Sequence, residues 1–448
     1  NSTRSASSTP AACTRRSSSD ALRMETHLAD WLKGTPDGIE AEEILRRCVH
    51  CGFCTATCPT YQLLGDERDG PRGRIYLMKA VLEGEEPTRA TQVHLDRCLT
   101  CRNCETTCPS GVEYGKLVDI GRRIVDAKVE RPLHQRLLRA ALREGLTRRW
   151  LFDPAMRVGK LVRPLLPSGL KSKVPDALPP GEWPTRQHAR RVLMPKGCVQ
   201  PAMMPNIDAA TARVLDAVGV QALRVPDSGC CGAIRMHLDD QSGAQAQARA
   251  NIDAWWPHLD GVEAILVNAS GCGVMVKDYG HLLRLDPDYA SRAERVASLA
   301  RDPVEWLPQA LAAAEVSVAP DARALAFHPP CTLQHGQQIR GEVERLLESL
   351  GARLVPVEDA HLCCGSAGTY SVTEPALSRE LRDRKLANLQ ARAPALILSA
   401  NIGCISHLAG ASAVPVRHWL EWLDERIAAG VAPDEPGSGA ASRESMSA

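Results

Sequence analysis

The stretch Leu362–Gly368 reads LCCGSAG, and the stretch Gly229–Ala233 reads GCCGA. Two adjacent cysteines followed by a glycine therefore occur twice in one chain. Neighbouring side chains of a regular strand point to opposite faces, so both thiols of such a pair serve one centre only where the backbone turns. The following glycines, Gly232 and Gly365, permit the positive φ of such a turn. We therefore expect each pair at a turn between a strand and a helix.

The two pairs belong to an internal duplication. In both halves one cysteine stands 32 residues before the pair, and another stands 41 or 40 residues after it. Apolar strand-like runs precede these cysteines and helical patterns follow them, which predicts α/β units with parallel strands and sites at the strand ends. The first set is Cys198, Cys230, Cys231 and Cys272, and the second is Cys331, Cys363, Cys364 and Cys404.

Two further cysteine runs lie near the N-terminus. Residues 48–59 read CVHCGFCTATCP and residues 98–109 read CLTCRNCETTCP, each a C-x2-C-x2-C-x3-C-P pattern. In the bacterial ferredoxin run, three cysteines bind one iron–sulfur cluster and the fourth reaches the other. Zinc prefers separated C-x2-C pairs in a tetrahedral site, so this pattern favours iron–sulfur over a zinc-stabilised scaffold. It predicts two [4Fe–4S] clusters, one on Cys48, Cys51, Cys54 and Cys108, the other on Cys98, Cys101, Cys104 and Cys58.

The organisation of the chain follows from these patterns. Helical apolar spacing over 72–82 and 114–129 predicts a helix-rich ferredoxin module. We expect an α+β multidomain protein in which two duplicated α/β units follow that module. The expected limits are a disordered tail at 1–23, the ferredoxin domain at 24–130, a basic connector with a Pro-rich spacer at 131–188, the two units at 189–316 and 317–428, and a disordered tail at 429–448. Met24 is a candidate for the native first residue.

Charge and hydropathy restrict the partners. With 54 Lys and Arg against 53 Asp and Glu, the chain has a net charge of +1, which argues against nucleic acid binding. No apolar run is long enough for a transmembrane segment, and no signal peptide is visible, so we expect a cytoplasmic protein. The connector Arg131–Lys173 is basic and helix-patterned. Such a stretch binds an anionic membrane or a partner, or packs on its own domain as a solvated linker; we favour the linker.

The duplicated cysteines have two interpretations. Four convergent thiols can hold a soft metal or an iron–sulfur centre, or they are structural thiols between two similar halves. His328, His361 and His407 are the histidines nearest to them in sequence, and a histidine in that position is more often a hydrogen-bonded packing residue. The chain has no GxGxxG, P-loop or HExxH motif, so we expect it to carry electrons and to contribute no catalytic residue.

The duplicated units resemble the CCG domains of heterodisulfide reductases and related respiratory subunits. That pattern closes with C-x2-C, whereas this chain reads CGVM, ending at Met275, and CISH, ending at His407. A thioether is a poor iron ligand, so Cys198, Cys230, Cys231 and Cys272 form the weaker candidate. The stronger candidate for a third centre is Cys331, Cys363, Cys364, Cys404 and His407. The altered endings also argue against disulfide-reducing catalysis.

From about Met24 to Arg426 the chain resembles the iron–sulfur subunits of bacterial glycolate oxidases (glycolate dehydrogenases). The resemblance rests on RCVHCGFCTATCPTYQLLGDE, LDRCLTCRNCETTCPSGV, NIDAWWP, SHLAG and VRHW. It implies a complex in which an FAD-binding partner subunit oxidises glycolate to glyoxylate. This chain would pass the electrons to a quinone or another respiratory acceptor, at the inner face of the cytoplasmic membrane through the complex. The alternatives are a heterodisulfide-reductase-like subunit and the related lactate or glycerol-3-phosphate dehydrogenase subunits.

Overall fold

A computed structural model describes residues 24–171, 173–176 and 179–431. The expected N-terminal tail, 1–23, lies outside the described residues, as does 432–448 of the expected C-terminal tail. The last helix, α23 (Trp419–Val431), extends three residues past the expected boundary at 428. Within the described part of the chain, no helix combines the length and the apolar character needed to cross a membrane.

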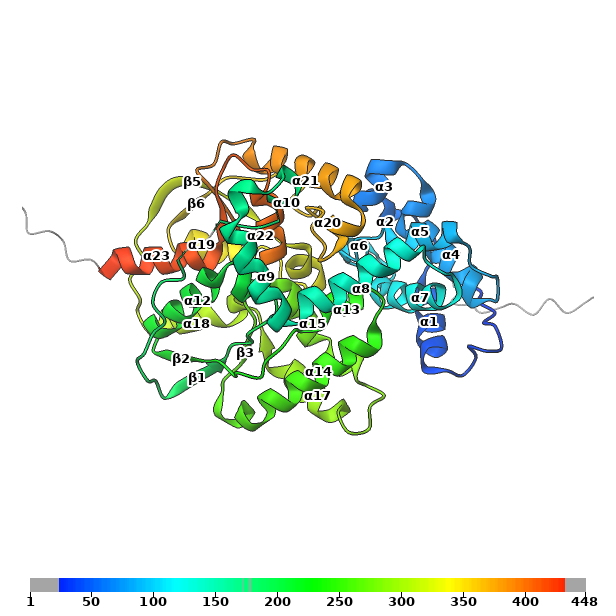
Figure 1. Cartoon of the computed structure of the whole chain (residues 1–448), viewed down its shortest axis with the longest axis horizontal. Helices are drawn as coiled ribbons and strands as arrows, with labels where there is room; N and C mark the ends of the chain where they lie inside the picture. The colour runs from blue at the N-terminus through cyan, green and yellow to red at the C-terminus, as the bar shows by residue number, and fades with distance from the viewer. Residues whose placement is uncertain (1–23, 172, 177–178, 432–448) are drawn as a thin grey trace, which may run out of the picture.

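The N-terminal module is built of helices alone, and Figure 1 shows it at one end of the molecule. Helices α4 and α7 match the two predicted helices to within one residue. Leu45 of α1, Met78 and Leu82 of α4 and Leu117 of α7 are fully buried in the core of this module. The elements are α1 (Pro36–Arg47), α2 (Phe53–Ala56), α3 (Pro59–Leu64), η1 (Glu67–Asp69), α4 (Pro71–Leu82), α5 (Arg89–Asp96), α6 (Asn103–Thr107) and α7 (Tyr114–Lys128).

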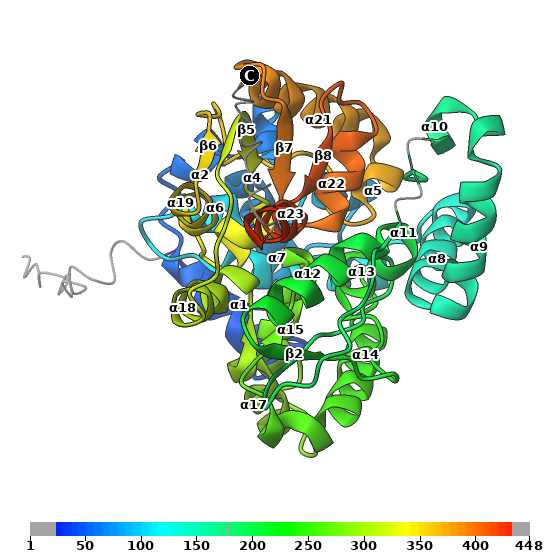
Figure 2. The same ribbon diagram turned by 90° about the vertical axis from the view of Figure 1, so that its left-hand side faces the viewer.

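The connector forms a helical hairpin. It consists of α8 (Leu133–Thr147), α9 (Arg149–Leu161), η2 (Arg163–Leu165) and α10 (Ser168–Lys171). Helices α8 and α9 pack against each other, and each also contacts a helix of the first duplicated unit. Figure 2 shows this hairpin on the side of the molecule, with its outer surface uncovered by the rest of the chain. The predicted connector therefore packs on its own chain through one side only.

The two duplicated units have the same sheet topology, which confirms the internal repeat. Each contains four parallel strands, in the order β2-β1-β3-β4 in the first unit and β6-β5-β7-β8 in the second. The first sheet is β1 (Arg190–Leu193), β2 (Val220–Leu223), β3 (Ile265–Leu266) and β4 (Ala300–Arg301). The second is β5 (Asp321–His328), β6 (Ala352–Leu354), β7 (Leu396–Ser399) and β8 (Val416–His418).

Helices cover both sheets. Those of the first unit are α11 (Gln200–Met203), α12 (Pro205–Ala217), α13 (Ala233–His237), α14 (Gln241–Trp255), η3 (Trp256–Gly261), α15 (Ser270–Lys277), α16 (Tyr279–Leu282), α17 (Ala290–Leu299) and α18 (Pro303–Ala313). Those of the second are η4 (Thr332–Gly336), α19 (Glu342–Ser349), α20 (Tyr370–Thr373), α21 (Pro375–Gln390), α22 (Ile402–Ala409) and α23. Because strands and helices alternate, the strands of each sheet run parallel.

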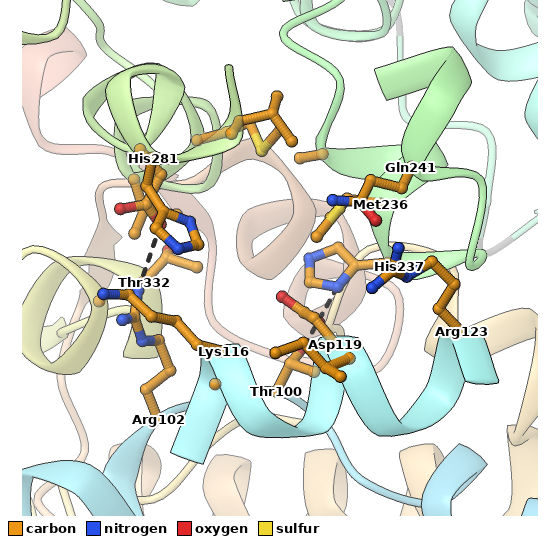
Figure 3. A pocket seen from close by; sticks show the side chains of 18 of the residues that line it. Thr100, Arg102, Lys116, Asp119, Arg123, Met236, His237, Gln241, His281 and Thr332 are labelled. Carbon is orange, nitrogen blue, oxygen red and sulfur yellow. Dashed lines mark hydrogen bonds and ion pairs between the residues drawn. The ribbon is translucent and has the colours of Figure 1, made fainter. Parts of the chain in front are cut away.

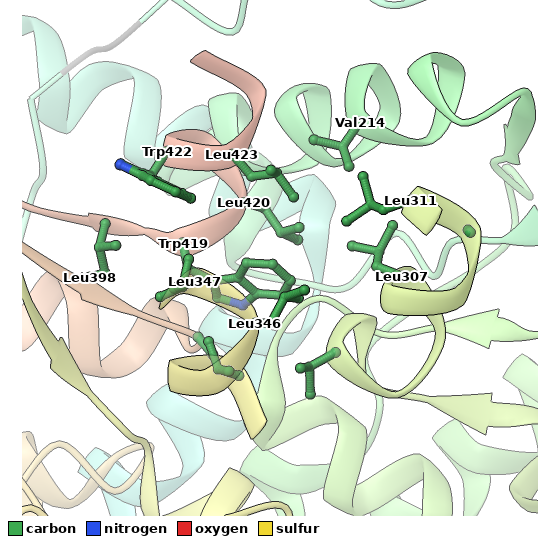
Figure 4. Packing of buried hydrophobic residues seen from close by; sticks show 14 of the residues in the cluster. Val214, Leu307, Leu311, Leu346, Leu347, Leu398, Trp419, Leu420, Trp422 and Leu423 are labelled. Atoms are coloured by element: carbon green, nitrogen blue, oxygen red, sulfur yellow. The ribbon is translucent and has the colours of Figure 1, made fainter. Parts of the chain in front are cut away.

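One apolar core joins the two units. Figure 4 shows Trp419, Leu420 and Leu423 of α23 packed against Val214 of α12 and Leu311 of α18, which belong to the first unit. The guanidinium of α12 Arg213 also donates to Asp424, with its Nη2 2.6 Å from the carboxylate. Since the last helix of the second unit buries its apolar side on the first, the two sheets are held in a fixed relation.

Candidate metal centres

The two N-terminal cysteine runs adopt the same local backbone. In each, the residue before the second cysteine and the residue after it have positive φ: His50 (52°) and Gly52 (86°) in the first run, Thr100 (51°) and Arg102 (59°) in the second. This left-handed turn folds a C-x2-C segment back on itself and brings its thiols to the same side. Pro59 then opens α3 directly after Cys58, as the pattern predicts.

The structure brings the first predicted set together. Cys48, Cys51, Cys54 and Cys108 line a single cavity, and burial raises the pKa of Cys48. Burial, together with the neighbouring thiols, raises the pKa of Cys54 to about 11. A free Cys54 would therefore keep its proton at neutral pH, and a bound metal is needed to hold it as a thiolate. Cys51 is exposed, so this group lies at the surface.

The second predicted set also converges. Cys58, Cys98, Cys101 and Cys104 line one cavity, so the fourth cysteine of each run lies with the other run. Burial raises the pKa values of Cys101 and Cys104 well above the usual thiol range. Both groups offer only sulfur donors, which is the donor chemistry that an iron–sulfur cluster requires.

A buried polar network around Asp69 and Arg74 lies beside the second group and links α4 to α5. Arg74 is 1% exposed; its Nε donates to the His94 carbonyl at 2.7 Å, and its Nη2 lies 3.4 Å from Asp69 Oδ1. Arg97 donates to Asp69 Oδ2 at 2.9 Å, and Thr60 Oγ1 donates to the Asp69 carbonyl at 2.7 Å. Two arginines thus neutralise the charge of Asp69. The short distance between Asp69 and His94 is therefore explained by this network, and a metal ion is not needed to account for it.

The second run packs against the second duplicated unit. Cys101 contacts a small buried cluster that contains Leu99, Cys331, Cys363 and Tyr370. The Tyr370 hydroxyl donates to the Arg97 carbonyl at 3.1 Å. The second cysteine group therefore lies beside the cysteines of the second unit, although these residues are more than 200 positions apart in the sequence.

A pocket separates the second run from the first unit. Figure 3 shows this cavity of about 130 Å³ between α7 and helices of the first unit. His237 Nδ1 lies 3.1 Å from Thr100 Oγ1, and Asp119 faces the same space. Burial raises the pKa of Asp119 to about 7. Both duplicated units thus cover the second cysteine group, whereas the first group has an exposed member.

The cysteines of the second unit form a buried chain of sulfur atoms. The Sγ atoms of Cys331 and Cys363 are 3.8 Å apart. The Gly365 amide donates to Cys363 Sγ at 3.4 Å, and Asn401 Nδ2 donates to Cys404 Sγ at 3.5 Å. Cys331 directly precedes η4, a π-helical turn, and such turns are frequent at functional sites.

Both vicinal pairs lie in loops between a strand and a helix, and both following glycines have positive φ, as predicted. The values are +99° at Gly232 and +84° at Gly365. A β-carbon on Gly365 would lie 2.6 Å from the Ser378 carbonyl oxygen. Only glycine fits this close approach without movement of the backbone.

The histidine beside these cysteines is His328, not His407. One ring nitrogen of His328 and the sulfurs of Cys364 and Cys404 lie within 4.8 Å of one another, and all three residues are buried. His407 is absent from this group because its Nε2 lies 3.3 Å from both the hydroxyl and the carbonyl of Ser378. In this structure His407, the candidate ligand of the third centre, is a hydrogen-bonded packing residue, whereas His328 lies beside the cysteines.

The four cysteines of the first unit also lie next to one another, but no histidine of the described chain joins them. Among the described residues, no metal-competent set of three ligands includes Cys198, Cys230, Cys231 or Cys272. Met275 lies in the apolar core of this unit. The carbonyl of Cys231 accepts a hydrogen bond from Tyr279 at 2.9 Å, and that of Cys230 accepts one from Asn251 at 2.8 Å. This pair is fixed by its backbone within a packed core.

Comparison with known protein families gives the same division of the chain into an N-terminal cysteine module and two duplicated units. Residues 44–112 match the 4Fe-4S dicluster domain model, and residues 192–277 and 325–409 match the model of the cysteine-rich CCG domain. The chain is therefore an iron–sulfur protein. A crystal structure of a hypothetical protein from Helicobacter pylori shares the fold, with a TM-score of 0.51 at 10% identity over 89% of this chain and 73% of that one.

Three relatives are informative. The glycolate oxidase iron-sulfur subunit of Escherichia coli is 53% identical over 90% of this chain and 99% of its own length. The probable glycolate oxidase iron-sulfur subunit of Bacillus subtilis is 33% identical over 81% of this chain and 87% of its own. Lactate utilization protein A of Geobacillus thermodenitrificans is 28% identical over 51% of this chain. With 53% identity over 90% of its length, the chain belongs to the family of glycolate oxidase iron–sulfur subunits.

Proposed function

We propose that this chain is the electron-transfer subunit of a flavin-dependent glycolate oxidase. An FAD-binding partner subunit would oxidise glycolate to glyoxylate, and this chain would carry the electrons to a quinone or another respiratory acceptor. The observation that carries the proposal is the placement of two sulfur-only groups, one at the surface and one between the module and the duplicated units. Oxidation of a 2-hydroxy acid needs a hydride acceptor held in its own fold, which the partner supplies.

We assign Cys48, Cys51, Cys54 and Cys108 to one [4Fe–4S] cluster, and Cys98, Cys101, Cys104 and Cys58 to the other. Such clusters take up and release one electron at a time. The buried Asp69–Arg74 pair lies beside the second group, against which the second duplicated unit packs. We also propose the domain limits 24–130, 131–188, 189–316 and 317–428, which the two sheets and their covering helices support.

The surface of the first group fits the electron donor. Exposed Cys51 is surrounded in the sequence and fold by large apolar side chains that face solvent: Val49 is 44% exposed, Phe53 60% and Tyr76 55%. Exposed apolar groups of this kind mark protein contacts. We place the flavoprotein here, because electrons entering at Cys51 can then pass inward to the second group.

The electrons would continue to a third centre in the second duplicated unit. Cys101 packs against the cluster that contains Cys331 and Cys363, and Cys364 and Cys404 lie together in a neighbouring apolar cluster. The first unit has four neighbouring cysteines but, in the part of the chain that the structure describes, no histidine beside them, and it would serve as a structural half. Removal of Cys364 should lower the iron content beyond the two ferredoxin clusters, whereas Cys231→Ser should leave it unchanged.

We further propose that the chain lies peripherally on the inner face of the cytoplasmic membrane through the α8–η2 hairpin. Residues 131–173 contain eleven Lys and Arg against two acidic residues. Basic helices with exposed Leu and Trp bind the surface of anionic bilayers. This surface supports the membrane alternative over the solvated linker. Its exposed apolar residues, 38% to 85% accessible, are Leu133, Leu137, Leu138, Trp150, Leu151, Val158, Leu161 and Leu165.

Vesicle binding tests this location. The chain should sediment with vesicles of phosphatidylglycerol and phosphatidylcholine but not with phosphatidylcholine alone. Replacing both Leu161 and Leu165 by Glu should abolish sedimentation. The control is Leu285→Glu, a leucine 64% exposed outside the hairpin, which should bind as the parent does. Equal binding of all three proteins would contradict the proposal.

The electron-carrier function has its own test. Anaerobically purified protein should contain about eight iron and eight sulfide ions from two clusters, in addition to any third centre. Cys51→Ser should remove one cluster and stop acceptor reduction by the complex, whereas Cys198→Ser should retain both. The isolated chain should not oxidise glycolate even with added FAD and a dye. Stoichiometric zinc without labile sulfide, or turnover by the isolated chain, would refute the assignment.

A further inference from the structure

His328 is a buried imidazole without a hydrogen-bond partner. It is 1% exposed, and within the described part of the chain neither Nδ1 nor Nε2 has a partner. A buried polar atom left unpaired costs about 1–3 kcal/mol, so native proteins rarely leave both nitrogens of one ring in this state. We therefore expect a ring nitrogen of His328 to bind a partner other than the polypeptide.

The sulfur atoms nearby indicate that this partner is a metal atom. A nitrogen of His328 and the sulfurs of Cys364 and Cys404 lie within 4.8 Å of one another. Donor atoms that share one tetrahedral metal atom, with metal–sulfur and metal–nitrogen bonds of about 2.0–2.3 Å, lie roughly 3.5–4 Å apart. Small side-chain shifts therefore suffice for all three atoms to reach one metal atom.

We propose that His328 is a ligand of the third centre, which would then have mixed thiolate and imidazole coordination. This inference rests on the third centre proposed above and replaces His407 in its ligand set. His407 is already engaged by Ser378, whereas both nitrogens of His328 are free.

The backbone fixes the ring of His328 in place. This residue ends β5, the strand between β6 and β7, and pairs in register with Ser399. Ser399 Oγ donates to the His328 carbonyl at 3.0 Å. Pro329 and Pro330 follow directly and restrict the chain beyond the strand. Because the main chain cannot rotate here, the imidazole is held toward the cysteines before any metal binds.

The first unit lacks the equivalent ligand. His328 precedes Cys331 by three residues, and the residue that precedes Cys198 by three is Pro195. The duplication therefore preserved four cysteines in each half but left an imidazole in only one. This difference agrees with the set of one imidazole and two thiols, which among the described residues occurs in the second unit and not in the first.

Imidazole coordination also gives the third centre a place in the electron relay. Replacing thiolate by histidine at an iron–sulfur centre removes negative charge and raises the reduction potential. A centre with His328 as ligand would then attract electrons from the neighbouring second group, whose ligands are all thiolates. Electrons would flow from the surface group at Cys51 toward the second unit.

Pulsed electron paramagnetic resonance on the reduced full chain tests the assignment. In protein labelled with nitrogen-15 histidine, the signal of the third centre should show a histidine nitrogen coupling. His328→Cys should retain the extra iron, lose that coupling and lower the reduction potential, because it supplies a thiolate instead. His328→Ala should lose the extra iron. The control His407→Gln should keep both the iron and the coupling.

The outcomes distinguish this inference from the function on which it rests. A third signal without a histidine coupling in the parent, or a coupling that survives in His328→Cys, would overturn the assignment of His328 and leave the third centre standing. A parent with only two clusters and no further iron would overturn both the third centre and its ligand. The electron-carrier role of the ferredoxin module would stand in either case.

Discussion

Substituting alanine for Gly365 should destabilise the protein more than the same change at Gly232, its counterpart in the first unit. Both glycines have left-handed backbones, so alanine costs each about 1–2 kcal/mol of conformational strain. At Gly232 the new β-carbon would lie 3.1 Å from the Ala244 carbonyl oxygen and 3.2 Å from the mobile end of Met275. Small shifts relieve those contacts, so about 1–2 kcal/mol is the whole expected effect.

At Gly365 the surroundings cannot yield in this way. The β-carbon would lie 2.6 Å from the Ser378 carbonyl oxygen and 2.9 Å from the β-carbon of Leu381. Relief requires helix α21 to move, and overpacking of this kind adds about 1–3 kcal/mol. The movement would also stretch the 2.7 Å hydrogen bond from Ser378 Oγ to the Gly365 carbonyl, worth about 1 kcal/mol. The total expected for Gly365→Ala is therefore about 3–6 kcal/mol.

Thermal unfolding under nitrogen, followed by circular dichroism with iron analysis of the folded protein, measures this difference. Gly365→Ala should unfold at the lower temperature and should lose the iron of the third centre, because Cys363 and Cys364 directly precede the displaced residue. Gly232→Ala should keep its iron. Equal unfolding temperatures for the two variants would refute the argument from steric contact.

Three more predictions follow from buried charges. Arg74→Met leaves Asp69 with one arginine partner and should cost about 3–5 kcal/mol in denaturant unfolding, with loss of the second cluster; an unchanged midpoint would contradict this. Burial raises the pKa of Asp302 to about 7, so the carboxyl holds its proton more firmly in the folded state than in the unfolded state. The contribution of the protonated carboxyl to stability is therefore lost as pH rises from about 4 through 7. Asp302→Asn cannot ionise and should therefore gain denaturant resistance over the parent across that range, whereas parallel pH profiles would exclude this role. Lys385 is a buried cation whose charge interacts with Cys364. Because a positive charge favours the reduced state, Lys385→Met should lower the reduction potential of the third centre in a redox titration. A higher potential would show that another charge controls it.

The sequence alone was sufficient wherever the determining interactions are local. The C-x2-C-x2-C-x3-C-P runs identified the iron–sulfur module because two-residue spacers force a short loop around one site. Apolar spacing located α4 and α7 to within one residue, since helical periodicity is read over a few turns. The equal intervals between Cys198 and Cys230 and between Cys331 and Cys363 revealed the duplication, and the two sheets repeat the same strand order.

Tertiary structure decided what depends on packing between distant segments. His407 was the natural choice for a ligand because it stands three residues after Cys404, on the same side of a helix. In the fold it lies about 4.5 Å further along α22 and turns to Ser378, whereas His328 reaches the cysteines from the end of a neighbouring strand. No local sequence pattern predicts that His328 lies near these cysteines, because strand β5 and helix α22 come together only in the folded unit. The position of Cys101 beside the cluster that holds Cys331, and the exposure of the hairpin, likewise arise only when the module, the hairpin and the two units pack together.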